Sequence, residues 1–251
     1  MRPEDYDAVA ELYDVFVNVE TDVPFLTAEA LRATGPVIEL MSGTGRVSLP
    51  LVEAGVDLTC VDGSRGMLDV LARKLAARDL RAQVQCADVC ELRLAERFEL
   101  AILPFNAFME LVGRERQRAA LASAFACLRP GGRFVCTLHN PAVRRRTVDG
   151  ALRVVGRFPL EGGTLVVSGS EHGGDPVVSR LQFYERFGPD GRLEWKRVLP
   201  MEFELIERTA FEEMATAAGF VVERLFGSYE RAPFDAAASP FMIWVLVKPA
   251  A

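Results

Sequence analysis

The chain has 251 residues, of which 50% are hydrophobic, and a net charge of −6 with an isoelectric point near 5.2. This length allows one domain or two, and the apolar content is ample for a sizeable core. The only dense basic cluster is Arg144-Arg145-Arg146, so nucleic acid is not expected as a partner. We expect these arginines to form a solvated loop rather than a contact for an anion or a substrate.

The five cysteines are odd in number, and most lie within apolar segments. They are typical of small core residues in a reducing compartment. No segment contains 18 consecutive apolar residues, and the charged N-terminus lacks the apolar stretch of a signal peptide. We therefore expect a cytoplasmic protein without a membrane span, and no metal site, because no further ligands at matching spacing accompany Cys86 and Cys90.

Residues 4–33 carry apolar side chains at helical spacing, so one face of this segment must pack against another part of the protein. Within it the pair Tyr6-Asp7 is repeated as Tyr13-Asp14. Amphipathic packing alone could account for both tyrosines.

The segment from Val37 to Val47 predicts a buried strand, a tight turn and the start of a helix. Gly43 and Gly45 lack a Cβ that would keep a ligand away from the outward-pointing backbone N–H groups. Glu39, at the end of the strand, would repel the pyrophosphate of a dinucleotide. S-adenosylmethionine has no phosphate, and its sulfonium and ammonium groups are compatible with a nearby carboxylate.

Three further predicted strands end at polar or loop residues. Val56–Val61 is followed by Asp62, and Arg81–Ala87 by Asp88. Phe98–Leu103 opens into a loop that begins with Pro104 and Phe105. The carboxyl ends of parallel strands lie at one edge of a sheet, where ligands bind. An acid at the position of Asp62 can accept hydrogen bonds from both hydroxyls of a ribose.

A helix is predicted from Glu115 to Leu128, followed by Pro130-Gly131-Gly132 and a strand from Phe134 to Leu138. This strand places His139 at its carboxyl end. A histidine with a pKa near 6.5 can accept a proton at neutral pH, so His139 is a candidate base. Hydrogen-bonded scaffolding is the alternative for a histidine at the tip of a strand.

From residue 151 to 205 the hydrophobic period changes to two, with the turn sequence Gly188-Pro189-Asp190-Gly191 in the middle. This pattern predicts an inserted antiparallel meander. Thr209-Ala210-Phe211-Glu212 then predicts a capping box, and the helix that it starts is expected to end at Gly219. Two apolar strands, Phe220–Phe226 and Phe241–Val247, complete the chain.

Several motifs in chain order resemble class I S-adenosylmethionine-dependent methyltransferases of the bacterial small-molecule type. The segment Glu39–Gly45 resembles the first motif of the family, although Met41 stands where its first glycine is usual. Ala87-Asp88-Val89 resembles the step that recognises adenine, and Leu128–Gly132 resembles a leucine-any-proline-glycine-glycine step before strand five. The resemblance implies a doubly wound, mostly parallel seven-stranded α/β sheet of Rossmann-like type with an antiparallel β insert.

The resemblance also implies roles for individual residues. Tyr13, in preference to Tyr6, would close over the methionine end of the cofactor, and Met67 would rest against the adenine. His139 and Tyr13 are the catalytic candidates. The residues expected to bind S-adenosylmethionine, or its product S-adenosylhomocysteine, are Tyr13, Glu39, Met41, Ser42, Gly43, Gly45, Arg46, Asp62, Gly63, Met67, Ala87, Asp88, Val89, Pro104 and Phe105.

We therefore predict a lid helix and cofactor-binding core over residues 1–150, a β insert covering the acceptor pocket over 151–205, and a final helix and two strands over 206–251. The expected function is direct in-line methyl transfer to a small-molecule acceptor, with nitrogen slightly favoured over oxygen. No membrane partner is expected, and the oligomeric state is left open, a homodimer included. Two alternatives remain: a protein that binds S-adenosylmethionine without methylating, and a nicotinamide-dependent oxidoreductase, against which Glu39 and Ser48 argue.

Overall fold

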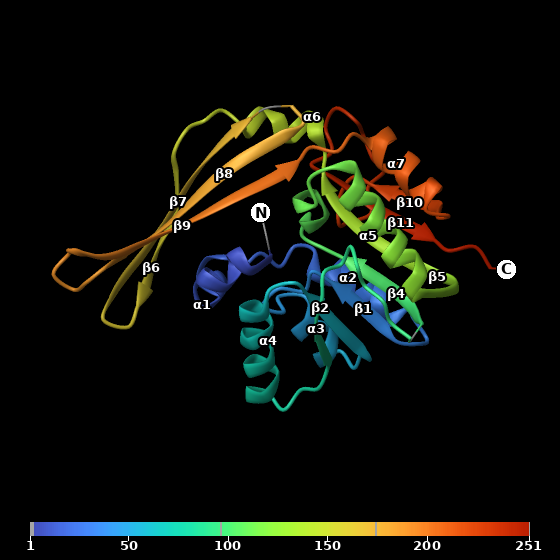
Figure 1. Ribbon diagram of the computed structural model, residues 1–251, viewed down its shortest axis with the longest axis horizontal. Coiled ribbons are helices and arrows are strands. Elements are labelled where there is room, and N and C mark those ends of the chain that lie inside the picture. The colour runs from blue at the N-terminus through green and yellow to red at the C-terminus, as the bar shows by residue number, and fades with distance from the viewer. Residues whose placement is uncertain (1–2, 96, 174, 251) are drawn as a thin grey trace.

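The computed structural model describes residues 3–95, 97–173 and 175–250, which form two β-sheets and the helices around them (Figure 1). Met1, Arg2, Glu96, Gly174 and Ala251 lie outside this description. The beginning of the predicted segment 1–150 and the last residue of the predicted segment 206–251 are therefore not described. Among the described residues, none of the helices is both long enough and apolar enough to span a membrane.

The larger sheet has seven strands in the order β10-β11-β5-β4-β1-β2-β3. All neighbouring pairs are parallel except those of β11, which runs antiparallel to both β5 and β10. This topology confirms the predicted doubly wound α/β fold. The strands are β1 (Val37–Leu40), β2 (Leu58–Asp62), β3 (Gln83–Cys86), β4 (Phe98–Leu103), β5 (Leu128–His139), β10 (Val221–Phe226) and β11 (Phe241–Val247).

Helices cover both faces of this sheet because successive side chains of a strand point to opposite faces. In β1, Val37 packs with one helical layer and Ile38 with the other. One layer contains α2 (Val23–Leu31), α3 (Ser48–Glu53) and α4 (Arg65–Ala77). The other contains α5 (Arg114–Cys127) and α7 (Arg208–Ala217). Each layer encloses a separate apolar core, and the carboxyl ends of the strands remain free for a site.

Two local predictions around the sheet were wrong. Helix α7 begins after Glu207 and its N-cap has no side-chain hydrogen bond, so Thr209 lies within the helix and the predicted capping box does not form. Strand β5 begins at Leu128, six residues before the predicted start at Phe134. Gly132 is part of this strand, and a Cβ there would come within 2.8 Å of the Arg129 carbonyl oxygen. Close backbone packing therefore explains this glycine.

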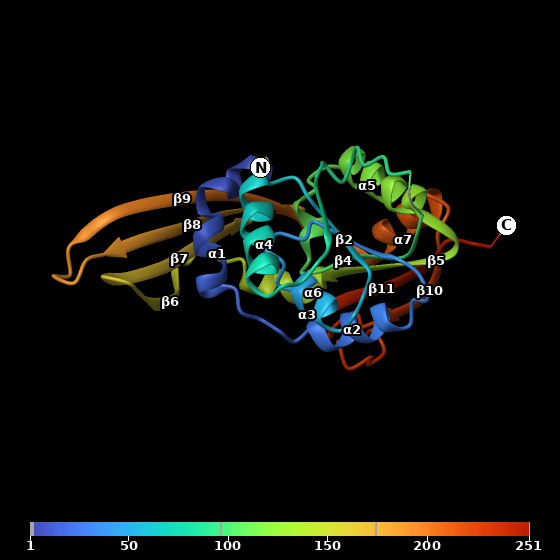
Figure 2. The same ribbon diagram turned by 90° about the horizontal axis from the view of Figure 1, so that it is seen from below.

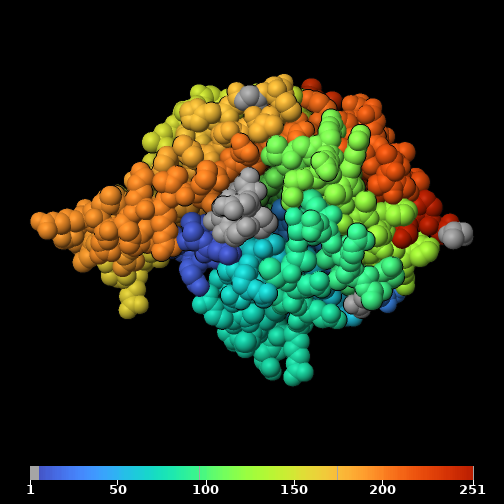
Figure 3. Space-filling view, viewed as in Figure 1, coloured from blue at the N-terminus to red at the C-terminus, as the bar shows by residue number. Residues whose placement is uncertain are grey.

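The smaller sheet is a four-stranded antiparallel meander, which projects beyond the larger sheet at the left of Figures 1 and 3. Its alternation is the reverse of what apolar patterning suggests: in β8 Gln182 and Tyr184 are buried, while the preceding Leu181 is exposed. The face that turns toward the rest of the protein is therefore partly polar. The strands are β6 (Arg153–Leu160), β7 (Gly163–Gly173), β8 (Val177–Phe187) and β9 (Leu193–Glu204).

The N-terminal segment lies between the smaller sheet and α4 (Figure 2). It consists of the 3-10 helix η1 (Pro3–Val9) and of α1 (Ala10–Phe16). Val9 packs with Leu165 of the sheet, whereas Ala10 packs with Met67 of α4. This segment thus joins the two sheets. The remaining short helices are η2 (Ala107–Glu110), α6 (Pro141–Arg144) and η3 (Arg145–Thr147).

Candidate active site

The turn after β1 has the left-handed backbone that glycines favour, with φ of 56° at Gly43 and 85° at Gly45. Met41, at the position of the motif's usual first glycine, also has a positive φ of 57°. A Cβ added to Gly43 would meet no atom within 4 Å, whereas one added to Gly45 would overlap the Leu71 side chain of α4. Gly43 therefore leaves the turn open to a ligand, and Gly45 allows the turn to pack against α4.

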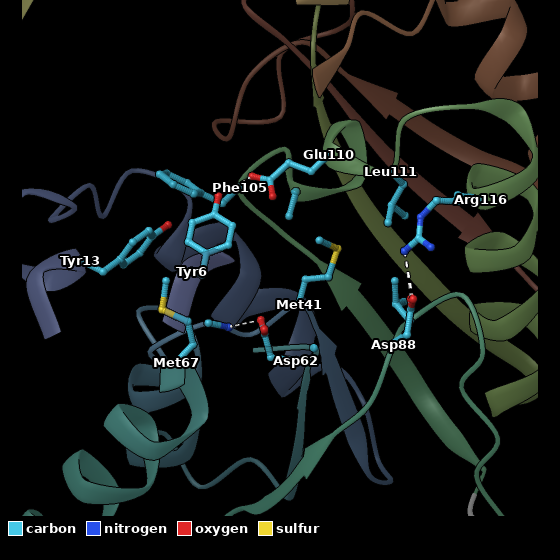
Figure 4. Close-up of a pocket in the computed structure, with 14 residues that line it drawn as sticks. Tyr6, Tyr13, Met41, Asp62, Met67, Asp88, Phe105, Glu110, Leu111 and Arg116 are labelled. Atoms are coloured by element: carbon cyan, nitrogen blue, oxygen red, sulfur yellow. Dashed lines mark hydrogen bonds and ion pairs between the residues drawn. The ribbon is translucent and has the colours of Figure 1, made fainter. Parts of the chain in front are cut away.

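A pocket opens beside this turn at the carboxyl ends of the strands (Figure 4). Its walls combine the turn, the ends of β2 and β3, the loop after β4 and the N-terminal segment. We call it the first pocket. It is lined by Tyr6, Tyr13, Met41, Gly43, Asp62, Gly63, Met67, Asp88, Val89, Phe105, Ala107, Glu110, Leu111 and Arg116.

Asp62 lies at the end of β2 with its carboxylate in the first pocket (Figure 4). Its Oδ2 accepts a hydrogen bond from the Gly43 N–H and its Oδ1 one from the Ser64 N–H, both at 2.8 Å. Burial raises the pKa of this carboxyl despite the two bonds. Each carboxylate oxygen has a second lone pair, so Asp62 can still accept from two hydroxyl groups.

Asp88 lines the first pocket after β3 and is already engaged by an arginine that the sequence analysis missed. Arg116 of α5 places Nη2 at 3.0 Å from its Oδ2, and the Cys90 N–H donates to its Oδ1 at 2.8 Å. Burial raises the pKa of Asp88, but these bonds outweigh it and leave the pKa below its usual value. Arg116 was not predictable because only the packing of α5 brings it to β3.

Other predicted binding residues support the pocket without lining it. Glu39 is buried beneath the turn and accepts a hydrogen bond from Ser48 Oγ at 2.5 Å. Burial raises its pKa to about 8. Arg46 forms a two-pronged ion pair with Asp22, at 2.5 and 2.6 Å, and its guanidinium lies 4.4 Å from the centre of the Phe105 ring. Ser42, Gly45, Ala87 and Pro104 are also absent from the pocket wall.

In the repeated tyrosine–aspartate pair, the two tyrosines have one role and the two aspartates have another. Tyr6 and Tyr13 both line the first pocket, with their rings edge to face. Asp7 accepts from the Gly66 N–H at 2.8 Å, and Asp14 accepts from Thr44 Oγ1 at 2.6 Å. The aspartates therefore fasten the N-terminal segment to the start of α4 and to the glycine turn, while the tyrosines face the pocket.

A second, larger cavity of about 490 Å³ adjoins the first pocket, and we call it the second cavity. The two share Tyr6, Tyr13, Phe105 and Glu110 as a common wall. Much of the remaining lining comes from α1, the smaller sheet and the C-terminal region: Phe16, Val17, Val155, Arg180, Gln182, Tyr184, Leu199, Met201, Phe203, Tyr229 and Phe241. Molecules bound in the two spaces would therefore both contact the side chains of this common wall.

His139 lines the second cavity and not the first pocket. Burial, with a smaller effect of the Arg144 charge, lowers its pKa to about 4. Its ring stacks on Phe241 with 5.4 Å between the ring centres. The histidine is therefore neutral at pH 7 and is a weaker base than the sequence suggested.

Glu110, at the end of η2, is the titratable residue of the common wall that the sequence analysis missed. Tyr6 Oη donates a hydrogen bond to its Oε1 at 2.9 Å. Burial raises its pKa to about 7, with a smaller contribution from the Asp62 charge. The available sequence signal was its position: it follows the strand-end loop that begins at Pro104, which was expected to lie at the ligand edge.

Comparisons with known proteins agree with this geometry. A family model described as a methyltransferase domain matches residues 37–132. The cypemycin N-terminal methyltransferase of a Streptomyces species is 26% identical, over 96% of this chain and 97% of its own length. The glycine/sarcosine N-methyltransferase of Parasynechococcus marenigrum is 28% identical over 78% and 66%. The solved structure of the CcbJ methyltransferase from Streptomyces caelestis matches 99% of this chain and 98% of its own, with a TM-score of 0.80 and 26% identity.

Proposed function

The chain belongs to the class I S-adenosylmethionine-dependent methyltransferases, and we propose that the group it methylates is an amine nitrogen of a small molecule. S-adenosylmethionine supplies an activated methyl group, so the protein needs no covalent intermediate. The residues of the protein have to hold the cofactor and the acceptor in line, exclude water and accept a proton. Of the two relatives described above, one is named as a glycine/sarcosine N-methyltransferase and the other as an N-terminal methyltransferase.

The first pocket offers suitable groups for each part of the cofactor. Asp62 would accept from the ribose hydroxyls, because its two oxygens keep free lone pairs next to the open backbone of Gly43. Asp88 would accept from the exocyclic amine of adenine, sharing its carboxylate with Arg116. The polarizable thioether of Met67 would lie against the adenine ring.

The observation that carries the proposal is the position of Glu110 in the wall common to the first pocket and the second cavity. A carboxylate attracts an ammonium group, and an ammonium has to lose a proton before its nitrogen can accept a methyl group. With a pKa of about 7, Glu110 can take that proton at neutral pH. An alcohol is a far weaker acid, and His139, with a pKa of about 4, is a poor base for it.

The choice between nitrogen and oxygen can be tested with matched acceptors. The purified protein would be incubated with S-adenosylmethionine and with pairs such as alanine and lactate, or glucosamine and glucose, and the products identified by mass spectrometry. We expect methylation of the amine members. Methylation of the hydroxyl groups at equal or greater rates would contradict the proposal.

The role of Glu110 can be tested by Glu110→Gln, which keeps an acceptor for Tyr6 but removes the charge. We expect kcat to fall by about 10²-fold or more, as for the loss of a general base. In the wild type kcat/KM should rise with pH through about 7, because Glu110 acts in its deprotonated form. This limb should disappear in the variant.

Glu115→Gln is the matched control, because Glu115 is exposed on α5 and does not line either space. It should leave the pH profile unchanged. Calorimetric titration with S-adenosylhomocysteine would show whether Glu110→Gln still binds the cofactor product. A Glu110→Gln variant with wild-type kcat and an unaltered pH limb would remove Glu110 from the mechanism.

A further inference from the structure

Two arginines meet around a single carboxylate near the second cavity. Arg144 of α6 and Arg180 of β8 both pair with Glu171 of β7, with Arg180 Nη1 at 3.6 Å from Glu171 Oε1. We call these three residues the arginine cluster. Both arginines line the second cavity. Two guanidinium groups opposite one carboxylate leave a surplus of one positive charge.

The fold, rather than the local sequence, builds this cluster. Arg180 and Glu171 are directly opposite each other in the β7–β8 pair, so their side chains lie on the same face. It is the face on which Gln182 and Tyr184 are buried and line the second cavity. The expectation that Arg144-Arg145-Arg146 forms a solvated loop is thus wrong for Arg144, whose guanidinium also lies 5.1 Å from the centre of the Phe203 ring.

Within the described part of the chain, the other ionisable residues that line the second cavity do not neutralise the surplus charge. Asp22 is taken up by its ion pair with Arg46, and His139 is neutral. Glu110 belongs to the wall shared with the first pocket. The positive charge of Arg180 acts on the Glu110 carboxyl and lowers its pKa, in opposition to the larger effect of burial. The cavity therefore carries a negative group at the wall toward the cofactor and a positive surplus at the arginine cluster.

We propose that the acceptor molecule carries a carboxylate, bound by Arg180 and Arg144, in addition to the amine that is methylated. Guanidinium groups match a carboxylate geometrically, because two parallel N–H donors meet its two oxygens. The acceptor is then an amino acid or a longer molecule with both an amine and a carboxylate. The part of this proposal that concerns the amine rests on the proposed function, whereas the part that concerns the carboxylate rests on the arginine cluster alone.

The test compares acids with their uncharged carboxamides. Protein loaded with S-adenosylhomocysteine would be titrated calorimetrically with glycine, 4-aminobutyrate and 6-aminohexanoate, and with the carboxamide of each. The three lengths cover different distances between amine and carboxylate. We expect at least one acid to bind tenfold or more tightly than its carboxamide. Equal affinity, or no binding, of acid and carboxamide in all three pairs would overturn the proposal.

Variants then assign the preference to the cluster. Arg180→Gln should abolish it, while Arg186→Gln on the same strand, whose arginine pairs with Glu194 and lies outside the second cavity, should retain it. Glu171→Gln should strengthen binding of the acid severalfold, because it frees both guanidinium groups from their competing carboxylate. A merely structural cluster would instead lose binding in Glu171→Gln, and that result would contradict the proposal.

The two proposals fail in different ways. If an acid binds with the expected dependence on Arg180 but its nitrogen is never methylated, the carboxylate site stands and the proposed amine chemistry is wrong. If the amines of the acids and of their carboxamides are methylated with the same kcat/KM, the proposed function stands and the carboxylate site is wrong.

Discussion

Asp62 illustrates how one side chain can serve both the fold and a ligand. Its carboxylate joins the glycine turn to the start of α4 through Gly43 and Ser64, and it faces the first pocket. Its position at the end of a strand could be predicted from sequence. The hydrogen bond from the Gly43 N–H could not, because Gly43 belongs to a separate turn that follows another strand.

We expect Asp62→Ala to weaken the binding of S-adenosylmethionine by at least tenfold, because the expected acceptor for the ribose hydroxyls is lost. Calorimetric titration would measure the affinity, and circular dichroism would establish that the variant is folded. Asp69→Ala, at an exposed position of α4, is the control. A folded Asp62→Ala variant with unchanged affinity would refute the ribose role.

Glu39 is expected to make stability depend on pH. Burial raises its pKa to about 8, so the folded state holds a proton that the unfolded state releases near its ordinary pKa of 4.5. The contribution is fully present below about pH 4.5 and is lost as the pH rises through about 8. Each pKa unit corresponds to about 1.4 kcal/mol, so the loss amounts to a few kcal/mol.

Urea unfolding of the wild type and of Glu39→Gln between pH 5 and pH 9 would measure this effect. Glutamine keeps the shape and stays neutral, so the free energy of unfolding of the variant should depend less on pH. Parallel pH dependences of the two proteins would show that Glu39 does not titrate in this range.

At the scale of elements, the two glycines of the first turn differ in what an added Cβ would contact. Both have positive φ, so alanine is strained at either position. Only at Gly45 would the new Cβ also overlap Leu71 of α4. From the sequence motif alone the two glycines would have the same role. The packing of α4 against the turn shows that their roles differ.

We expect Gly45→Ala to lower the free energy of unfolding by about 1–3 kcal/mol more than Gly43→Ala, since overpacking adds to the backbone strain. Gly43→Ala should mainly weaken cofactor binding, because its Cβ would enter the space beside the turn. Denaturant unfolding and calorimetric titration of both variants would test this. Equal destabilisation with equal affinities would show that the contact with Leu71 does not matter.

The smaller sheet shows where element-level prediction from sequence fails. The period of two correctly indicated strands over residues 151–205, but it did not show which face of β8 is covered. Gln182 and Tyr184 face inward and line the second cavity, and Gln182 donates a hydrogen bond to Tyr184 Oη at 2.8 Å. A buried polar face of this kind cannot be distinguished from a solvated one by periodicity alone.

On the scale of the whole molecule, the cofactor should stabilise the protein measurably. Binding only to the folded state at a concentration 100 times Kd contributes about 2.7 kcal/mol. For a chain of this length each kcal/mol raises Tm by about 2–4 °C. We therefore expect S-adenosylhomocysteine to raise Tm by about 5–10 °C in differential scanning fluorimetry. NADH at the same concentration is the control, and an equal shift with NADH would contradict the assignment of the first pocket.

The sequence by itself determined the individual strands and the strand ends that carry Asp62 and Asp88, because hydrophobic periodicity and turn residues are local properties of the chain. The seven-stranded sheet followed from the motifs that resemble the family. Only the tertiary structure decided which side chains meet in the two spaces. Glu110 comes together with Tyr6, and Arg180 with Arg144, from segments far apart in the chain. Their electrostatic properties follow from burial and from these long-range contacts, which no local pattern encodes.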